Sequence, residues 1–200
     1  MKKEFVNFAN KIIEEIVKKP KRCEAGALPY LFLGNKISEH SFYIKVGRNF
    51  EKWFKFVAEH SDGFELLPDG VTKKVVKNES KDIDFIIKSK KLKTIYYREL
   101  KSNLELDTEK LPATIDKVTL IKKYLSKNYS GYKIDCGILH WAVYNDRVLP
   151  KKYKSKLKQC SENGVSVYYP KDLFRLLNQK ISEKEYYDLF RNIAKKYLMS

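Results

Sequence analysis

Apolar residues recur along the chain at two different spacings, and each spacing predicts one kind of secondary structure. Residues 4–18 place Phe5 and Ile16 on one stripe of a helix that Pro20 would end. Residues 47–60 repeat this helical spacing. Further helices are predicted over residues 108–126, 151–163 and 171–179, and from Ser182 onward, where Glu185 completes a capping box. The chain is therefore predicted to be rich in amphipathic helices.

A second group of segments consists of short runs of β-branched and aromatic residues, which are typical of strands. Ile83–Ile87 and Thr94–Leu100 form the clearest pair, joined by a lysine-rich turn. The other predicted strands are residues 64–67, 71–76, 134–143 and 165–169. Residues 21–46 give no clear element and suggest no role. The order of helices and strands predicts an α/β fold with a mixed β-sheet flanked by helices.

The domain organisation follows from the length and from the absence of repeats or linkers. The chain has 200 residues, enough for one domain with a substantial core. We expect a single domain with a helical N-terminal segment 1–46, a core over about residues 47–178, and a C-terminal helix 182–198.

The charge of the chain suggests its partners. Lysine and arginine number 41 against 25 aspartate and glutamate residues, which gives 41 − 25 = +16 at neutral pH. Such a protein attracts polyanions, and DNA and RNA are the main candidates because binding to phosphates releases condensed counterions. A Lys-rich surface without a nucleic-acid partner is the plainer alternative.

Cysteine usage and the N-terminus suggest a cellular compartment. Cys23, Cys136 and Cys160 are scattered, without C-x-x-C or zinc-ligand spacing, and are predicted to be small buried residues in a reducing environment. Glu14 and Glu15 fall where the apolar core of a signal peptide would run. With no stretch of transmembrane length, we expect a cytoplasmic protein with no membrane partner.

The candidate chemistry lies in the predicted hairpin. Side chains alternate along a strand, so Glu99 and Lys101 share one face. A four-residue turn, Lys90–Lys93, would place Asp84 opposite Glu99, whereas a two-residue turn would place Asp82 there. Either register brings two carboxylates and an amine to one end of the hairpin.

That combination suits a metal-dependent reaction on phosphodiesters. Two carboxylates can hold Mg²⁺ while leaving positions for water and phosphate, and a lysine can orient the water or offset developing charge. The alternative is a salt-bridged hairpin edge. A second triplet, Glu79-Ser80-Lys81, follows a literal Pro68-Asp69, but its surroundings predict a polar loop and we treat it as incidental.

Asp84, fifteen positions before Glu99-Leu100-Lys101, resembles the catalytic hairpin of the PD-(D/E)XK superfamily of nucleases, and most of all type II restriction endonucleases. The proline that usually precedes the catalytic aspartate is replaced by Ile83. The helix that carries Glu51 looks like the N-terminal helix of that family, which can supply an extra acidic ligand. The resemblance covers about residues 47–178 in architecture but only three or four residues in motif.

This resemblance implies a restriction-endonuclease-like core and Mg²⁺-dependent hydrolysis of double-stranded DNA by a homodimer, with no small-molecule cofactor. It implies Asp84, Glu99 and Lys101 as catalytic residues. It also implies a metal site formed by Asp84, Glu99 and the backbone carbonyl of Leu100, with Glu51 and Asp82 as further candidates. Candidate DNA-binding residues are Lys90, Lys91, Lys93, Asn103 and Lys110.

Three other functions are carried as alternatives. The first is a structure-selective or repair nuclease of the same superfamily, which would not cut DNA into discrete fragments. The second is a non-catalytic, basic nucleic-acid-binding protein whose acidic hairpin is structural. The third is an RNA- or ribosome-associated factor. Converging carboxylates disfavour the last two, because they repel phosphate unless a cation lies between them.

Overall fold

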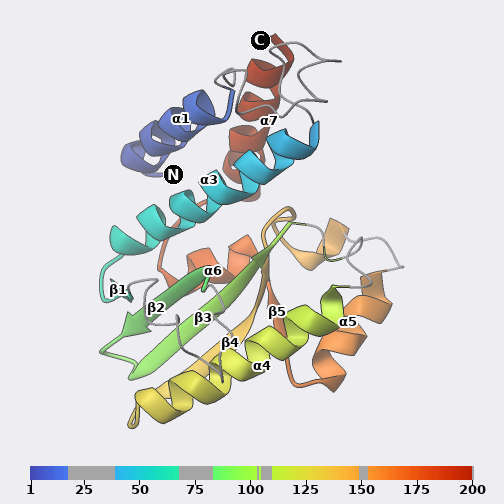
Figure 1. Cartoon of the computed structure of the whole chain (residues 1–200). Helices are drawn as coiled ribbons and strands as arrows, with labels where there is room; N and C mark the ends of the chain where they lie inside the picture. Colours follow the sequence, from blue (N-terminus) through green and yellow to red (C-terminus); the bar gives the residue numbers. More distant parts are fainter. Residues whose placement is uncertain (18–38, 68–82, 103, 105–109, 149–152, 200) are drawn as a thin grey trace, which may run out of the picture. The chain divides into compact units, whose positions relative to one another are not determined.

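The structure is a computed structural model that describes residues 1–17, 39–67, 83–102, 104, 110–148 and 153–199. Contacts divide the chain into two compact units: Met1–Phe56 with Ser182–Ser200, and Val57–Ile181. The first unit is helical, and the second holds the β-sheet (Figure 1). The predicted α/β fold with a mixed sheet flanked by helices is confirmed.

The helical unit contains α1 (Lys3–Val17), most of α3 (Glu39–Glu59) and α7 (Glu183–Met199). The apolar stripe predicted for the first helix is buried, including Phe5 and Ile16. Trp53 of α3 is also buried, and its indole Nε1 donates a hydrogen bond to the backbone oxygen of Phe5 at 3.2 Å. This bond satisfies the one polar group of the tryptophan within an apolar core.

Two predicted features of this unit can be compared directly with the structure. The predicted helix 47–60 begins earlier, at Glu39, because a glycine inside a helix costs only about 1 kcal/mol and packing overcomes it at Gly47. The capping box at the start of α7 is present: the Ser182 hydroxyl and backbone N–H both donate to Glu185. The amino group of Met1 also pairs with Glu185, and these bonds lower the pKa of that carboxyl to about 2.

The sheet unit has five strands in the order β1-β2-β3-β4-β5. Their bounds are β1 Glu65–Leu66, β2 Phe85–Ser89, β3 Thr94–Lys101, β4 Lys133–His140 and β5 Ser166–Tyr168. The first three strands are antiparallel, and β3, β4 and β5 are parallel. The predicted strand over residues 71–76 lies outside the described residues.

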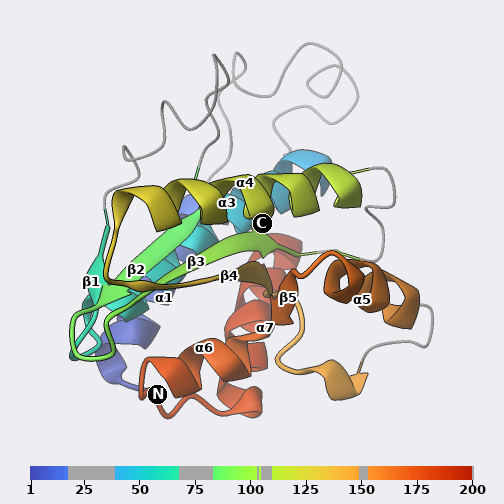
Figure 2. The same ribbon diagram turned by 90° about the horizontal axis from the view of Figure 1, so that it is seen from below.

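Helices cover both faces of this sheet. Their bounds are α4 Leu111–Asn128, α5 Tyr153–Glu162 and α6 Pro170–Leu176, with a short 3-10 helix at Asp146–Val148. Figure 2 shows α4 and α6 on opposite sides of the sheet, with α5 beside β5. Because α4 connects two parallel strands, β3 and β4, its N-terminal end lies at the carboxyl end of β3.

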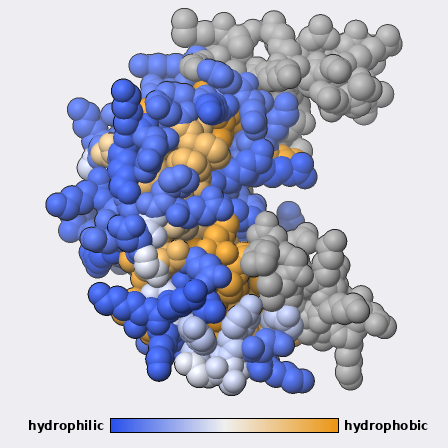
Figure 3. All heavy atoms as spheres, turned by 90° about the vertical axis from the view of Figure 1, so that its left-hand side faces the viewer, coloured by the Kyte–Doolittle hydropathy of each residue, from blue (hydrophilic) through white to orange (hydrophobic). Residues whose placement is uncertain are grey.

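The described surface is mostly hydrophilic on the face drawn in Figure 3, as the composition predicts. Among the described residues, no helix combines the length and the apolar character needed to span a membrane.

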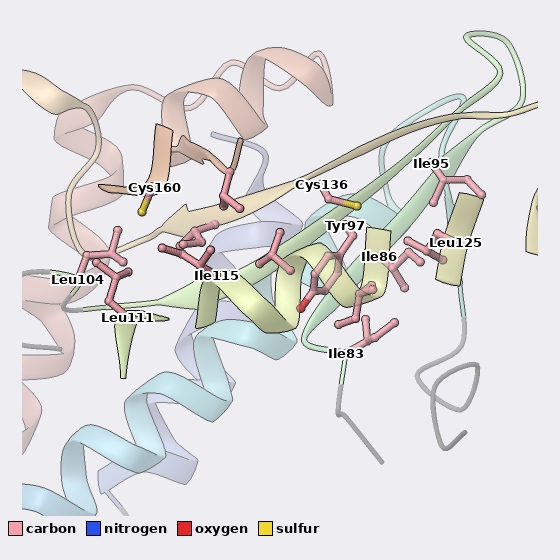
Figure 4. Packing of buried hydrophobic residues seen from close by; sticks show 14 of the residues in the cluster. Ile83, Ile86, Ile95, Tyr97, Leu104, Leu111, Ile115, Leu125, Cys136 and Cys160 are labelled. Atoms are coloured by element: carbon pink, nitrogen blue, oxygen red, sulfur yellow. The ribbon is translucent and has the colours of Figure 1, made fainter. Parts of the chain in front are cut away.

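The core of the sheet unit lies between α4 and the sheet. Tyr97, Ile138 and Ile121 are fully buried there, and Figure 4 shows Tyr97 and Cys136 among the side chains that pack in this layer. Cys136 and Cys160 are buried and free, as predicted, whereas Cys23 lies outside the described residues. This layer fixes the position of α4 against the end of β3.

Candidate active site

The β2–β3 hairpin decides between the two predicted registers. Ser89 pairs with Thr94 across the four-residue turn Lys90–Lys93, and Phe85 pairs with Arg98. Continuing this register by one residue places Asp84 opposite Glu99. Asp84 Oδ2 accepts a hydrogen bond from the backbone N–H of Leu100 at 2.9 Å, which ties the two chains together where the strand pairing ends.

The predicted catalytic residues meet at the carboxyl end of β3. Glu99 is 3 % exposed, although it is an acid. Lys101 Nζ lies 3.6 Å from Glu99 Oε1. The side chain of Asp84 is 21 % exposed and that of Lys101 is 27 % exposed, so both remain partly open to solvent. The backbone N–H of Trp141 donates to Lys101 O at 3.0 Å and anchors the strand end to the chain that follows β4.

A residue that the sequence reasoning missed completes the cluster. Lys117, in the second turn of α4, places its Nζ 2.6 Å from Glu99 Oε2 and 3.6 Å from Asp84 Oδ1. The signal for it was present in the helix pattern, because Thr114 and Ile121 are both buried and position 117 lies between them at helical spacing. A lysine at an inward-facing position of this helix indicates that an acidic side chain lies nearby inside the protein.

Tyr97 is a hydrogen-bond partner of Glu99. It is fully buried, and its hydroxyl donates a hydrogen bond to Glu99 Oε2 at 2.6 Å. Burial raises the pKa of Tyr97 far above its ordinary value, and the negative charge of Glu99 raises it further. The hydroxyl therefore stays protonated and acts only as a donor toward the carboxylate.

Burial and charge act against each other at Asp84. Burial raises the pKa of Asp84 to about 7, and repulsion by Glu99 adds to the rise, whereas Lys117 and the Leu100 N–H oppose it. Burial lowers the pKa of Lys117, but attraction by Glu99 and Asp84 outweighs it and the pKa is raised. Burial and mutual repulsion therefore disfavour two ionised acids at this place, and the positive charge of Lys117 offsets part of that effect.

The donor set fits a divalent cation. An oxygen atom of Glu99 and one of Asp84 lie 2.6 Å and 3.6 Å from the same positively charged atom, Lys117 Nζ. Hard carboxylate oxygens are the ligands that Mg²⁺ prefers. Within the described residues, no group of three or more His, Cys, Asp or Glu side chains gathers in this way. The site therefore offers two carboxylates and leaves the other coordination positions to water, backbone or substrate.

The remaining candidate residues differ in what the structure describes of them. Glu51 is on α3, in the helical unit, and its carboxylate pairs with Lys55 at 2.7 Å. Asp82, Asn103 and Glu79 lie outside the described residues. The exposed turn residues Lys90, Lys91 and Lys93 are at the opposite end of β3 from Glu99, at least about 20 Å away at about 3.3 Å per residue. Lys110 is exposed and is the N-cap residue of α4, at the same end of the sheet as Glu99.

The opposite face of β3 carries a second charged cluster. Arg98 is 4 % exposed, and its Nη1 lies 2.9 Å from both Asp135 O and Asp135 Oδ1. Its guanidinium carbon is 3.6 Å from the centre of the Tyr168 ring, and the Tyr168 hydroxyl donates to Asp135 Oδ1 at 2.8 Å. Gly137 makes room for this stack, since a Cβ there would lie 2.6 Å from the Tyr168 ring.

Comparison of the chain with models of protein families, with curated proteins and with solved structures finds no significant match.

Proposed function

We propose that this protein is a Mg²⁺-dependent endonuclease of the PD-(D/E)XK type that cleaves double-stranded DNA at a short specific sequence, as a type II restriction endonuclease does. The observation that carries the proposal is the convergence of Asp84 and Glu99 on one cationic atom, with Lys101 3.6 Å from Glu99. Two carboxylates and a lysine in this arrangement suit metal-assisted hydrolysis of a phosphodiester.

The architecture supports this proposal. The mixed sheet, the antiparallel hairpin and the α4 crossover between β3 and β4 are compatible with a restriction-endonuclease-like core. The acidic pair lies at the carboxyl end of β3, next to its parallel neighbour β4. In open α/β sheets, ligands bind in crevices outside the carboxyl ends of the strands, so the site lies where a substrate is expected.

Each residue of the cluster has a role in this proposal. Asp84 and Glu99 would hold Mg²⁺, with the Leu100 carbonyl as an additional oxygen ligand. When bound, Mg²⁺ supplies Lewis acidity and lowers the pKa of a coordinated water. Lys101 orients the attacking water and offsets the negative charge that develops on the phosphate. Tyr97 holds Glu99 in place through the hydrogen bond to Oε2.

The proposed partner is DNA. The formal charge of +16 favours a polyanion, and phosphate contacts by lysines position a protein on a duplex. A palindromic site would be cut by a homodimer, since two-fold DNA symmetry matches two-fold protein symmetry. The buried free thiols of Cys136 and Cys160 suit a reducing, cytoplasmic environment.

One observation favours a second candidate, a non-catalytic nucleic-acid-binding protein. Lys117 already neutralises part of the charge of Asp84 and Glu99, so the acids have a partner within the protein and can serve as a structural network. This candidate predicts DNA binding that is independent of divalent metal and is never followed by cleavage.

A digestion experiment separates the candidates. Purified protein is incubated with unmethylated phage DNA in Mg²⁺ or in EDTA, beside the Glu99→Gln variant as a matched control. Discrete fragments only with Mg²⁺ and only from the unmodified protein support a restriction endonuclease. A smear with the same dependence supports a structure-selective or repair nuclease. DNA from several sources that is bound in a gel-shift assay but left intact supports the non-catalytic candidate.

A further inference from the structure

Lys117 differs from Lys101 in how it contacts the acidic pair. Lys101 approaches one carboxylate, at 3.6 Å from Glu99 Oε1. Lys117 contacts both, at 2.6 Å from Glu99 Oε2 and 3.6 Å from Asp84 Oδ1. Its side chain is only 16 % exposed, so the ammonium lies within the cluster rather than on the surface.

The position of this ammonium is the one that a metal ion would need. A Mg²⁺ ion held by both acids takes their oxygens at about 2.0–2.1 Å. The Lys117 ammonium already bridges an oxygen of each acid. The ammonium and a metal ion cannot occupy the same place, and as neighbours they repel each other and compete for the same lone pairs.

The helix leaves a path for Lys117 to move away. Side chains on a helix lean toward its N-terminus, so Lys117 extends over the preceding turn, where Ala113 is small and exposed. A four-carbon side chain can swing past such a residue into solvent while the buried stripe of α4, including Ile121, stays packed.

We propose that Lys117 is an internal counter-ion that occupies the metal position in the metal-free protein and is displaced when the metal binds. This inference rests on the proposed function. The ion pair stabilises the acidic pair before the metal arrives and keeps the metal-free site near neutral, with two acids facing Lys101 and Lys117. It also weakens metal binding, because the ion must replace an ammonium that is already held by both carboxylates.

The test measures metal affinity without DNA and without activity. Mn²⁺ stands in for Mg²⁺, and the electron paramagnetic resonance signal of the free aqua ion reports the unbound fraction. Lys117→Met keeps the length and helix propensity of the side chain but removes the competing charge, so it should bind Mn²⁺ tighter by about tenfold or more, which is about 1.4 kcal/mol per factor of ten. Lys123→Met, an exposed lysine on the same helix, is the matched control and should bind like the unmodified protein.

A second variant keeps the charge and protects the test against a folding defect. Lys117→Arg retains a cation whose planar fork holds carboxylates more firmly than an ammonium, so it should bind Mn²⁺ several-fold more weakly. Thermal unfolding gives an independent readout: Lys117→Met should unfold at a lower temperature without metal and regain more stability from Mn²⁺ than the unmodified protein does.

The outcomes distinguish this inference from the proposed function. If the unmodified protein binds Mn²⁺ and Lys117→Met binds equally or more weakly, Lys117 is not a competing counter-ion and only this inference is overturned. Unchanged binding by Lys117→Arg overturns it in the same way. If neither the unmodified protein nor Lys117→Met binds Mn²⁺, the metal site itself is absent, and both the proposed function and this inference fail.

Discussion

Arg98 and Glu99 are neighbours in β3, both buried and both charged, yet they lie in opposite kinds of surroundings. Arg98 has one acid, Asp135, so its charge is matched one to one, and its guanidinium lies over two aromatic rings, Tyr168 and Tyr96. Glu99 lies against a second acid, Asp84, and two lysines approach the pair from different elements. Arg98 and Asp135 form a one-to-one ion pair, whereas Asp84 and Glu99 are two acids that share the positive charge of Lys117.

The electrostatic surroundings follow the same division. Burial and repulsion by Glu99 raise the pKa of Asp84 to about 7. On the other face, the Tyr168 hydroxyl also donates to Asp135, so the carboxylate has two partners. Under the proposed function, the cluster of Asp84 and Glu99 serves catalysis, whereas the fully paired cluster of Arg98 and Asp135 serves stability. Four predictions test this division.

The largest effect is expected from loss of the acids or the lysine of the functional cluster. Asp84→Asn, Glu99→Gln and Lys101→Met should each lower the cleavage rate by at least about 10²–10³-fold, because each removes a charge that acts in the transition state. DNA binding in a gel-shift assay should change little, and each variant should still fold. Asp82→Asn should be milder, and Glu79→Ala nearly silent. Loss of cleavage in the Glu79→Ala variant would instead assign the active site to the triplet Glu79-Ser80-Lys81.

The next largest effect is on stability and belongs to the opposite face. Arg98→Met should lower the free energy of unfolding by about 3 kcal/mol, because it leaves Asp135 without its cation and removes the stack on Tyr168. Urea denaturation measures this loss. Arg191→Met is the control: its pair with Asp188 is exposed, and the change should stay within about 0.5 kcal/mol. Similar losses for both variants would contradict the stabilising role assigned to the Arg98 cluster.

A pH dependence should follow from Asp84. Its folded-state pKa of about 7 lies above the ordinary value of 3.8, so the folded, metal-free protein holds a proton that the unfolded chain releases. The contribution of Asp84 to stability is therefore lost as the pH rises from about 4 to about 7, and it is constant above that range. The difference in unfolding free energy between the unmodified protein and Asp84→Asn should fall across this window. A difference that is flat or rises with pH contradicts the raised pKa.

The smallest effect is expected from removing the hydrogen bond between Tyr97 and Glu99. Tyr97→Phe keeps the buried ring but removes the donor to Glu99 Oε2, so the carboxylate loses part of its orientation. Cleavage should slow by roughly tenfold, equivalent to about 1.4 kcal/mol for one bond to a charged group. Initial rates at saturating Mg²⁺ measure it, with the partly exposed Tyr132→Phe as a control. Equal rates for the two variants would show that Tyr97 only packs.

The sequence by itself determined the local features of this protein. Alternation along the strands was enough to put Glu99 and Lys101 on one face and to limit the partner of Glu99 to Asp84 or Asp82. Helical spacing predicted α1, α4 and the capping box of α7 with ends accurate to a few residues. These features depend on neighbours within a few positions, which the order of residues fixes directly.

Boundaries that depend on a partner strand were less accurate. The predicted strand 134–143 ends at His140, because β3 stops at Lys101, its partner in the ladder. The predicted strand 83–87 is shifted to Phe85–Ser89, because Lys88 is held between Glu65 and Ile95 of its two neighbours. A strand ends where its hydrogen-bonding partner ends, and that partner is remote in sequence.

Only the tertiary structure decided which charges meet. Packing of α4 against β3 and β4 brings Lys117 to Glu99, eighteen positions away, and to Asp84, which is farther still. The four-residue turn, rather than the two-residue one, selects Asp84 over Asp82 as the acid opposite Glu99. The pairing of Arg98 with Asp135 likewise requires β4 to lie beside β3. Electrostatic partners depend on distance in space, and a chain rich in lysine offers many candidates until the fold selects among them.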